Sequence, residues 1–136
     1  MGLSDRFPES QIIGIDITDE HIIEPVRQRK NIDIEIADIY QQHSVEQFRQ
    51  KHSQLVDIII DDALHDPGSQ YLAFQLWRLV LAPGGIYVIE DVYDPGQLSY
   101  LLSRQNENWD IFLGDTRIYS NGASGDSILF GMVRIG

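Results

Sequence analysis

The sequence predicts an α/β fold with a mostly parallel sheet, and two observations support this prediction. Short segments rich in Ile and Val alternate along most of the chain with segments whose apolar residues recur at helical spacing. The strand segments are apolar almost throughout, which is typical of parallel strands covered on both faces. The last two are joined by a turn-rich stretch without a helical pattern, so an antiparallel pair is expected at the end of the sheet.

Six segments have the β-branched, apolar character of strands. They are residues 11–17, 32–39, 55–62, 85–92, 109–115 and 127–135. Two helices are expected between the first three of them. Thr18 precedes one at 19–30, with Pro25 as a kink, and Ser44 with Gln47 forms a capping-box pair that opens the other at 45–53.

Two further helices are expected after Asp-Pro pairs. Asp66 and Pro67 open a segment at 68–82, where leucines recur at helical spacing until Pro83-Gly84-Gly85 ends it. Asp94 and Pro95 repeat this opening before residues 96–105. There is no internal repeat and no interdomain linker, so residues 1–136 are expected to form a single domain.

Composition excludes several classes of protein. No apolar run approaches the roughly 20 residues of a membrane span. The formal net charge is −11, which disfavours binding to nucleic acid or to anionic lipid. The chain has no cysteine and no recognisable secretory signal, so we expect a cytoplasmic protein.

Acidic side chains follow each of the early strands. Taken singly, an aspartate at such a position more often caps a helix or a turn. In an open parallel sheet, however, ligands bind outside the carboxyl ends of the strands. The acids at these positions are Asp16, Asp38, Asp61, Asp62, Glu90 and Asp91.

Three of these carboxylates, Asp62, Glu90 and Asp91, would lie close together if neighbouring strands carry them. Oxygen ligands without cysteine suit Mg²⁺, Mn²⁺ or Ca²⁺. His65 would stand at the rim of that site, where a histidine can act as a general base, although a histidine in a loop is more often a surface residue. Asp16 has the position of a carboxylate that binds ribose hydroxyls.

The motifs "IIGIDI", "VDIIIDDALH" and "WRLVLAPGGIYVIEDV" resemble, in order and spacing, class I S-adenosylmethionine-dependent methyltransferases, whose sheet is Rossmann-like. The pattern D-D-x-x-H followed by P-G-G-x-Y-V-I-E-D is similar, more narrowly, to the metal-dependent macrolide and sugar O-methyltransferases of antibiotic biosynthesis. The resemblance covers residues 7 to about 92.

The resemblance implies a role for each strand-end residue. Asp62, Glu90 and Asp91 fall where that family binds its divalent metal, Mg²⁺ or another divalent cation, and His65 falls where it places a catalytic base. The cofactor positions of the family fall on Asp16, Asp38, Ile39 and Asp61. The implied reaction transfers the methyl group of S-adenosylmethionine to a hydroxyl of a small-molecule acceptor, and two loops, residues 93–100 and 117–127, would select that acceptor.

Members of this family begin with a strand and a glycine-rich loop that do not occur in these 136 residues. We therefore expect an N-terminally truncated sheet whose missing strand would expose two edges, at the strands that end in Asp16 and Asp62. Either these strands close up on each other, another chain fills the gap, or the sequence is a piece of a longer enzyme, and we expect self-association into a homo-oligomer. A truncated, non-catalytic module for binding or oligomerisation is the alternative.

Two other folds agree less well with the sequence. A phosphoacceptor receiver domain needs a lysine at a late strand end, whereas Lys30 and Lys51 are both early. A nicotinamide dehydrogenase needs a G-x-G-x-x-G motif, which the chain lacks.

Overall fold

The structure is a computed structural model that describes residues 3–104, 109–115 and 128–135. The chain divides into two compact units, residues 1–44 and 45–136, and each is described by itself. The single domain expected for residues 1–136 stays a prediction. No helix within the described residues is long and apolar enough to cross a membrane.

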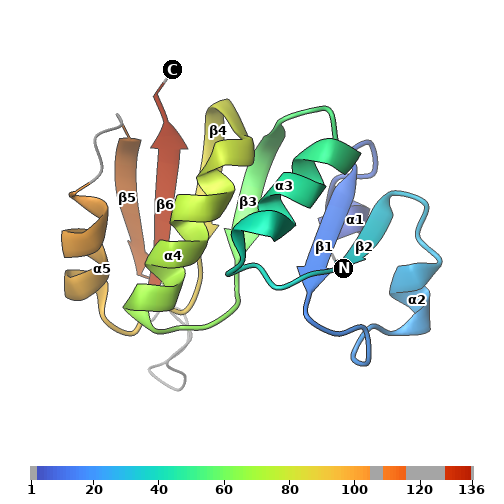
Figure 1. Ribbon diagram of the computed structural model, residues 1–136, viewed down its shortest axis with the longest axis horizontal. Helices are drawn as coiled ribbons and strands as arrows, with labels where there is room; N and C mark the ends of the chain where they lie inside the picture. Colours follow the sequence, from blue (N-terminus) through green and yellow to red (C-terminus); the bar gives the residue numbers. More distant parts are fainter. Residues whose placement is uncertain (1–2, 105–108, 116–127, 136) are drawn as a thin grey trace. The chain divides into compact units, whose positions relative to one another are not determined.

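The first unit contains a two-stranded parallel sheet. Strands β1 (Ile12–Asp16) and β2 (Ile32–Ile36) pair in register from Ile12 opposite Ile32 to Asp16 opposite Ile36 (Figure 1). Two single-turn helices, α1 (Leu3–Arg6) and α2 (Glu24–Arg27), accompany them. Both strands agree with the expected segments, so the parallel pairing of the early strands is confirmed.

The helix expected at residues 19–30 is wrong in its extent. Only α2 forms there, and Pro25 lies in its first turn instead of kinking a longer helix. Proline suits this position because the first-turn N–H groups have no partner within the helix, so the missing N–H costs nothing.

The second unit is built on a four-stranded sheet of β3 (Val56–Asp61), β4 (Leu81–Ile89), β5 (Trp109–Asp115) and β6 (Ile128–Arg134). The strand order is β3-β4-β6-β5. Strands β3 and β4 are parallel, whereas β6 runs antiparallel to both β4 and β5. The antiparallel pair expected at the carboxyl-terminal end is confirmed.

Helices α4 (Pro67–Trp77) and α5 (Pro95–Leu102) start where the Asp-Pro pairs predict. Asp66 Oδ1 accepts a hydrogen bond from the backbone N–H of Ser69 at 2.9 Å, and Asp94 caps α5 in the same way. A short 3₁₀ helix, η1 (Arg78–Val80), continues α4. These starts are local features, because a capping side chain and a first-turn proline act within a few residues.

Helix α3 (Gln42–Lys51) begins before the expected capping box. Ser44 is therefore buried inside the helix and does not cap it, and this part of the prediction is wrong. Within the second unit, Phe48 of α3 packs edge-on against Trp77 of α4, with ring centroids 5.4 Å apart.

The core of the second unit lies between α4 and one face of the sheet. Gln70, Ala73, Phe74 and Trp77 form the buried side of α4. The Phe74 ring meets Tyr87 of β4 edge-on, with centroids 5.2 Å apart, and it meets Trp109 of β5 in the same way at 5.1 Å. Figure 1 shows α4 lying across the strands on this side.

The Pro83-Gly84-Gly85 motif lies inside β4, whereas the sequence predicts that it ends a helix. Helix α4 has already ended at Trp77, and β4 starts at Leu81. Gly84 has φ of 77°, which an L side chain rarely adopts. The register of β4 against β3 shifts between Val56 and Ile58, so the motif forms an irregularity at the start of the strand.

Candidate functional site

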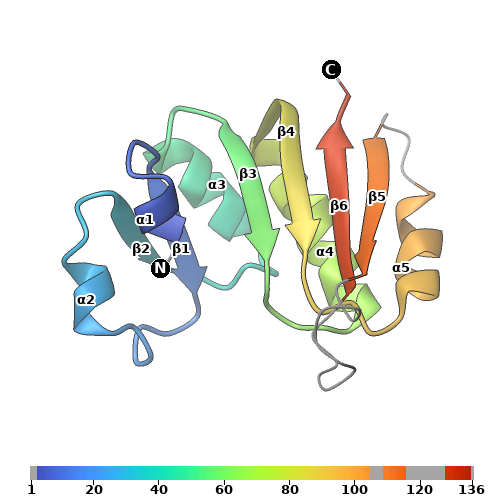
Figure 2. The same cartoon turned by 180° about the vertical axis from the view of Figure 1, so that it is seen from behind.

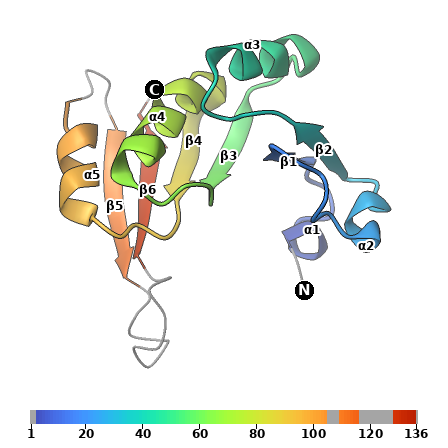
Figure 3. The same cartoon turned by 60° about the horizontal axis from the view of Figure 1, so that its bottom comes forward.

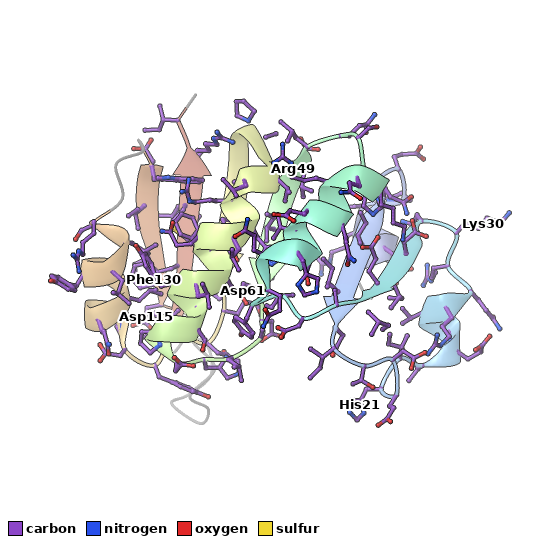
Figure 4. All side chains as sticks on the ribbon, in the orientation of Figure 1. His21, Lys30, Arg49, Asp61, Asp115 and Phe130 are labelled. Carbon is purple, nitrogen blue, oxygen red and sulfur yellow. The ribbon has the colours of Figure 1, made fainter. Side chains whose placement is uncertain are left out.

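Two pairs of acidic residues, Asp61-Asp62 and Glu90-Asp91, lie at the ends of the neighbouring strands β3 and β4. Asp61 on β3 is opposite Ile89 on β4, and the backbone N–H of Glu90 donates to the carbonyl of Asp61 at 2.9 Å. The parallel pairing therefore brings Asp62 and Asp91 to the same end of the sheet. Asp61, at this end of β3, is labelled in Figure 4.

Asp62, His65 and Asp91 form a group that could hold a metal ion. Each offers one ligand atom, and these atoms lie within 4.8 Å of one another. Asp62 follows β3, His65 lies in the loop before α4, and Asp91 follows β4. Asp91 has φ of 51°, a conformation that is uncommon for a residue with a side chain and that is often found at functional sites.

Glu90 lies close to this group but is not one of its three members. Burial raises the pKa of the Glu90 carboxyl above its usual value, and the charges of Asp62 and Asp91 raise it further. Such repulsion among carboxylates is relieved by a bound cation. The electrostatics thus agree with the expected ligand set of Asp62, Glu90 and Asp91, and that set stays a prediction.

His65 packs edge-on against Tyr93, with ring centroids 5.5 Å apart. Its Nδ1 atom is buried and has no hydrogen-bond partner among the described residues. A histidine base or ligand is usually oriented by a hydrogen bond at one ring nitrogen. Here the described residues orient the ring by packing against Tyr93.

Asp61 is 6% exposed. Its Oδ2 accepts a hydrogen bond from the Tyr87 hydroxyl and its Oδ1 accepts one from the backbone N–H of Ala63, both at 3.3 Å. Burial raises the pKa of the Asp61 carboxyl to about 6, against the lowering effect of these two hydrogen bonds. The Asp61 carboxylate thus has hydrogen-bond donors within the protein, whereas the Asp62 side chain is exposed.

The candidate cofactor residues of the first unit lie at the ends of β1 and β2. Asp16 is exposed, and its Oδ1 accepts from the backbone N–H of Thr18 at 3.2 Å. Asp38 accepts from the backbone N–H of Tyr40 at 2.9 Å and from the Gln41 side chain at 3.2 Å.

Both aspartates thus form the turn contacts that such residues commonly make. Ile39 follows Asp38 and is half-buried. The cofactor roles of all three residues stay predictions.

Two residues that position the site have no role assigned from the sequence, although one of them, Tyr87, lies in the P-G-G-x-Y-V-I-E-D motif. Tyr87 donates to Asp61, and the Gln70 side chain donates to the carbonyl of Glu90 at 3.2 Å. Gln70 is 1% exposed and lies on the apolar side of α4. A glutamine at a core position of a helix was the available signal, because a buried amide requires hydrogen-bond partners. The expected acceptor loop at 117–127 lies outside the described residues.

No protein-family model and no curated protein sequence matches the chain. Among solved structures, it is similar to the MycE methyltransferase from the mycinamycin biosynthetic pathway in complex with Mg and SAH, with 30% identity and a TM-score of 0.56. That match covers 69% of this chain but 24% of MycE, so the chain spans about a quarter of the length of that enzyme.

Two more distant structures match nearly the whole chain. The O-methyltransferase from Bacillus cereus in complex with SAH has 13% identity and a TM-score of 0.64, over 91% of this chain and 62% of that one. An rRNA methylase from Streptococcus thermophilus has 13% identity and a TM-score of 0.58, over 93% of this chain and 89% of that one. At this identity the likeness shows the fold. The chain thus has the Rossmann-like fold that these S-adenosylmethionine-dependent methyltransferases share.

Proposed function

We propose that the chain takes part in transfer of a methyl group from S-adenosylmethionine to a hydroxyl of a small molecule, with a divalent metal at the ends of β3 and β4. The observation that carries the proposal is the convergence of Asp62, His65 and Asp91 at the carboxyl edge of a methyltransferase sheet. The motif resemblance suggests a sugar or natural product as the acceptor, and MycE is a methyltransferase of the mycinamycin biosynthetic pathway.

The residues at this edge fit a divalent cation. Asp62 and Asp91 offer carboxylate oxygens, and Glu90 adds a third carboxylate nearby. Such a ligand set suits Mg²⁺ or Mn²⁺. When bound, a divalent ion lowers the pKa of a coordinated hydroxyl and places it for reaction.

The protein side chains would supply alignment and a proton acceptor. His65 stands beside the two aspartates, where it can accept the proton of the acceptor hydroxyl. Asp62 and Asp91 would hold the ion at the ends of β3 and β4. In this proposal Asp16, Asp38, Ile39 and Asp61 contact the cofactor.

Isothermal titration with S-adenosylhomocysteine, with and without Mg²⁺, tests the cofactor half of the proposal. We expect saturable binding by the folded chain. Circular dichroism checks folding, and a folded chain that does not bind S-adenosylhomocysteine would contradict the proposal and favour the non-catalytic alternative.

Methyl transfer to a catechol, followed with a radiolabelled methyl donor, tests the chemical half. We expect turnover that requires Mg²⁺, and in the Asp91→Asn variant at least a tenfold loss with little change in affinity for S-adenosylhomocysteine. Asp57→Asn, at an exposed position on β3, is the matched control. Turnover that EDTA leaves unchanged would exclude the metal.

A further inference from the structure

Helix α4 begins beside the candidate metal group, and its start brings two polar side chains together. Asp66 is the N-cap residue of α4, and Pro67 is the first residue of the helix. His65 is therefore the residue before the cap, and Gln70 is the fourth residue of the helix. Side chains at these two positions often pack against each other across the start of a helix. Figure 3 shows the loop that leads from the end of β3 into this helix start.

Both side chains carry a buried polar atom that has no hydrogen-bond partner among the described residues. In His65 the atom is Nδ1, and in Gln70 it is Oε1. An imidazole Nδ1 that carries the proton is a donor, whereas an amide Oε1 is an acceptor. A donor and an acceptor that both lack a partner, at two positions that pack together, are complementary. Buried polar groups are rarely left unpaired, so a hydrogen bond that links these two atoms is the simplest account.

The orientation of the Gln70 amide is fixed by its other contact. Its Nε2 donates to the carbonyl of Glu90 at 3.2 Å. A flipped amide would place Oε1 against this carbonyl, and two acceptors form no hydrogen bond. Oε1 is therefore the end of the amide that remains for a donor. Gln70 is 1% exposed, so that donor has to come from within the protein or from a buried water.

The Gln70 side chain also joins the start of α4 to the end of β4. Glu90 precedes Asp91, whose backbone has φ of 51°. Gln70 thus ties the carbonyl next to Asp91 to the helix start next to His65. Asp91 and His65 each offer a ligand atom, and the two atoms lie within 4.8 Å of each other. Figure 2 shows β3 and β4 ending on the same side of the sheet, where this link lies.

We propose that Gln70 is a positioning residue for His65, an inference that rests on the proposed function of His65 as the base. The Oε1 atom of Gln70 accepts a hydrogen bond from the Nδ1–H of His65, directly or through one buried water. This bond selects the neutral tautomer in which Nδ1 carries the proton and Nε2 has a free lone pair. Nε2 is then the nitrogen that takes up the proton of the acceptor hydroxyl.

The tautomer of His65 can be measured without cofactor, metal or acceptor. The chain is labelled with ¹⁵N-histidine, and long-range ¹H–¹⁵N correlation spectra are recorded in EDTA at about pH 8.5, well above the ordinary pKa of histidine. A protonated ring nitrogen and an unprotonated one resonate far apart, so the spectra distinguish the two tautomers. The His65→Gln variant assigns the His65 signals among those of the 4 histidines. We expect the Nδ1–H tautomer, which free histidine disfavours.

Matched variants connect this tautomer to Gln70. Gln70→Met keeps the length of the side chain and removes the amide, so we expect the His65 signals to move to the Nε2–H tautomer or to a mixture of the two. Gln75→Met makes the same change on the same helix, at a glutamine whose Nε2 is also buried without a partner among the described residues. We expect no change in that variant. Circular dichroism checks that both variants fold.

Kinetics give a second comparison in a chain that transfers methyl groups. Gln70→Met should lower kcat at least about tenfold with little change in KM for the acceptor, because the base is misoriented while the acceptor still binds. Gln75→Met should leave both constants unchanged. A loss of the same size in the two variants would show a general effect on α4 and would contradict the positioning role.

Two spectroscopic results would overturn the inference. One is a wild-type chain in which His65 has the Nε2–H tautomer, a result that needs no variant to fold. The other is an Nδ1–H tautomer that a folded Gln70→Met variant keeps. A chain that shows the expected tautomers but no methyl transfer would instead confirm the link between Gln70 and His65 and contradict the proposed function, so the two can fail separately.

Discussion

The carboxylates at the ends of β3 and β4 lie in unequal surroundings although their sequence context is similar. Asp61 is buried and held by Tyr87, whereas its neighbour Asp62 is exposed and faces His65 and Asp91. Alternation along a strand explains the difference, because successive side chains point to opposite faces of the sheet. We infer that Tyr87 and Ala63 fix the orientation of the Asp61 carboxylate, and that Asp62 is the one available to a metal ion.

The pKa of Asp61 predicts a pH effect on stability. Its carboxyl has a pKa of about 6 in the folded protein and 3.8 as the ordinary value. The folded state therefore holds this proton more tightly, and the free energy of unfolding should fall as pH rises from about 4 through 6. The full shift corresponds to about 3 kcal/mol, of which about 1 kcal/mol falls between pH 5 and 7.

Urea unfolding in EDTA at pH 5 and pH 7 measures this effect. Asp61→Asn keeps an oxygen acceptor and removes the titration, so the wild-type chain should lose about 1 kcal/mol more than the variant over this range. Asp57→Asn, on the same strand but exposed, controls for a general change in charge. Equal pH slopes for the wild-type chain and Asp61→Asn would show that the Asp61 carboxyl does not titrate as inferred.

At the scale of elements, strand β4 carries most of the geometry of the site. Its irregular start contains Gly84 and Gly85, its middle supplies Tyr87, and its end is followed by Glu90 and Asp91. The Arg134 guanidinium of β6 donates to the carbonyl of Leu81 at 2.7 Å, which ties the start of β4 to its neighbour. A change at the start of β4 is therefore expected to affect the whole strand.

Gly85 should not tolerate a side chain. A Cβ atom there would lie 2.9 Å from the carbonyl oxygen of Ala82 and 3.0 Å from that of Asp57, which is closer than real Cβ contacts. We expect Gly85→Ala to lower the free energy of unfolding by about 1–3 kcal/mol.

Gly114→Ala is the matched control for this substitution. Gly114 lies on β5, and its added Cβ would meet the side chain of Leu129 on β6 at an ordinary 3.6 Å. Urea unfolding compares the two variants, and an equal effect on both would mean that crowding at Gly85 is relieved by a shift of the backbone.

At the scale of the whole molecule, acidic charge dominates. Twenty-one acidic and ten basic residues give the net charge of −11, and several of the acids gather at one end of the four-stranded sheet. Self-repulsion of this size destabilises a compact chain. The homo-oligomer and the cytoplasmic location stay predictions at this scale.

Divalent metal should therefore stabilise the fold specifically. At a Mg²⁺ concentration of 100 times Kd, a single site adds about 2.7 kcal/mol to the free energy of unfolding. We expect Mg²⁺ to raise Tm more than NaCl of equal ionic strength does, and we expect Asp91→Asn to remove that excess. If NaCl and Mg²⁺ are equivalent at equal ionic strength, the effect is screening and the site does not bind metal.

Features that depend on local chemistry could be predicted from the amino-acid sequence. All six strands were located within a few residues, because β-branched runs bounded by turn residues leave few other conformations. The Asp-Pro starts of α4 and α5 were correct because capping acts within one turn. The motif resemblance led to the methyltransferase fold that the solved structures share.

Features that depend on neighbours distant in sequence could not be predicted in this way. The grouping of His65 with Asp62 and Asp91 requires the parallel register of β3 and β4, and so does the burial of Asp61 beneath Tyr87. The face of the four-stranded sheet that α4 covers is likewise set by packing, because alternation assigns residues to two faces but does not say which face a helix covers. Packing between elements fixes these features, and no local pattern encodes it.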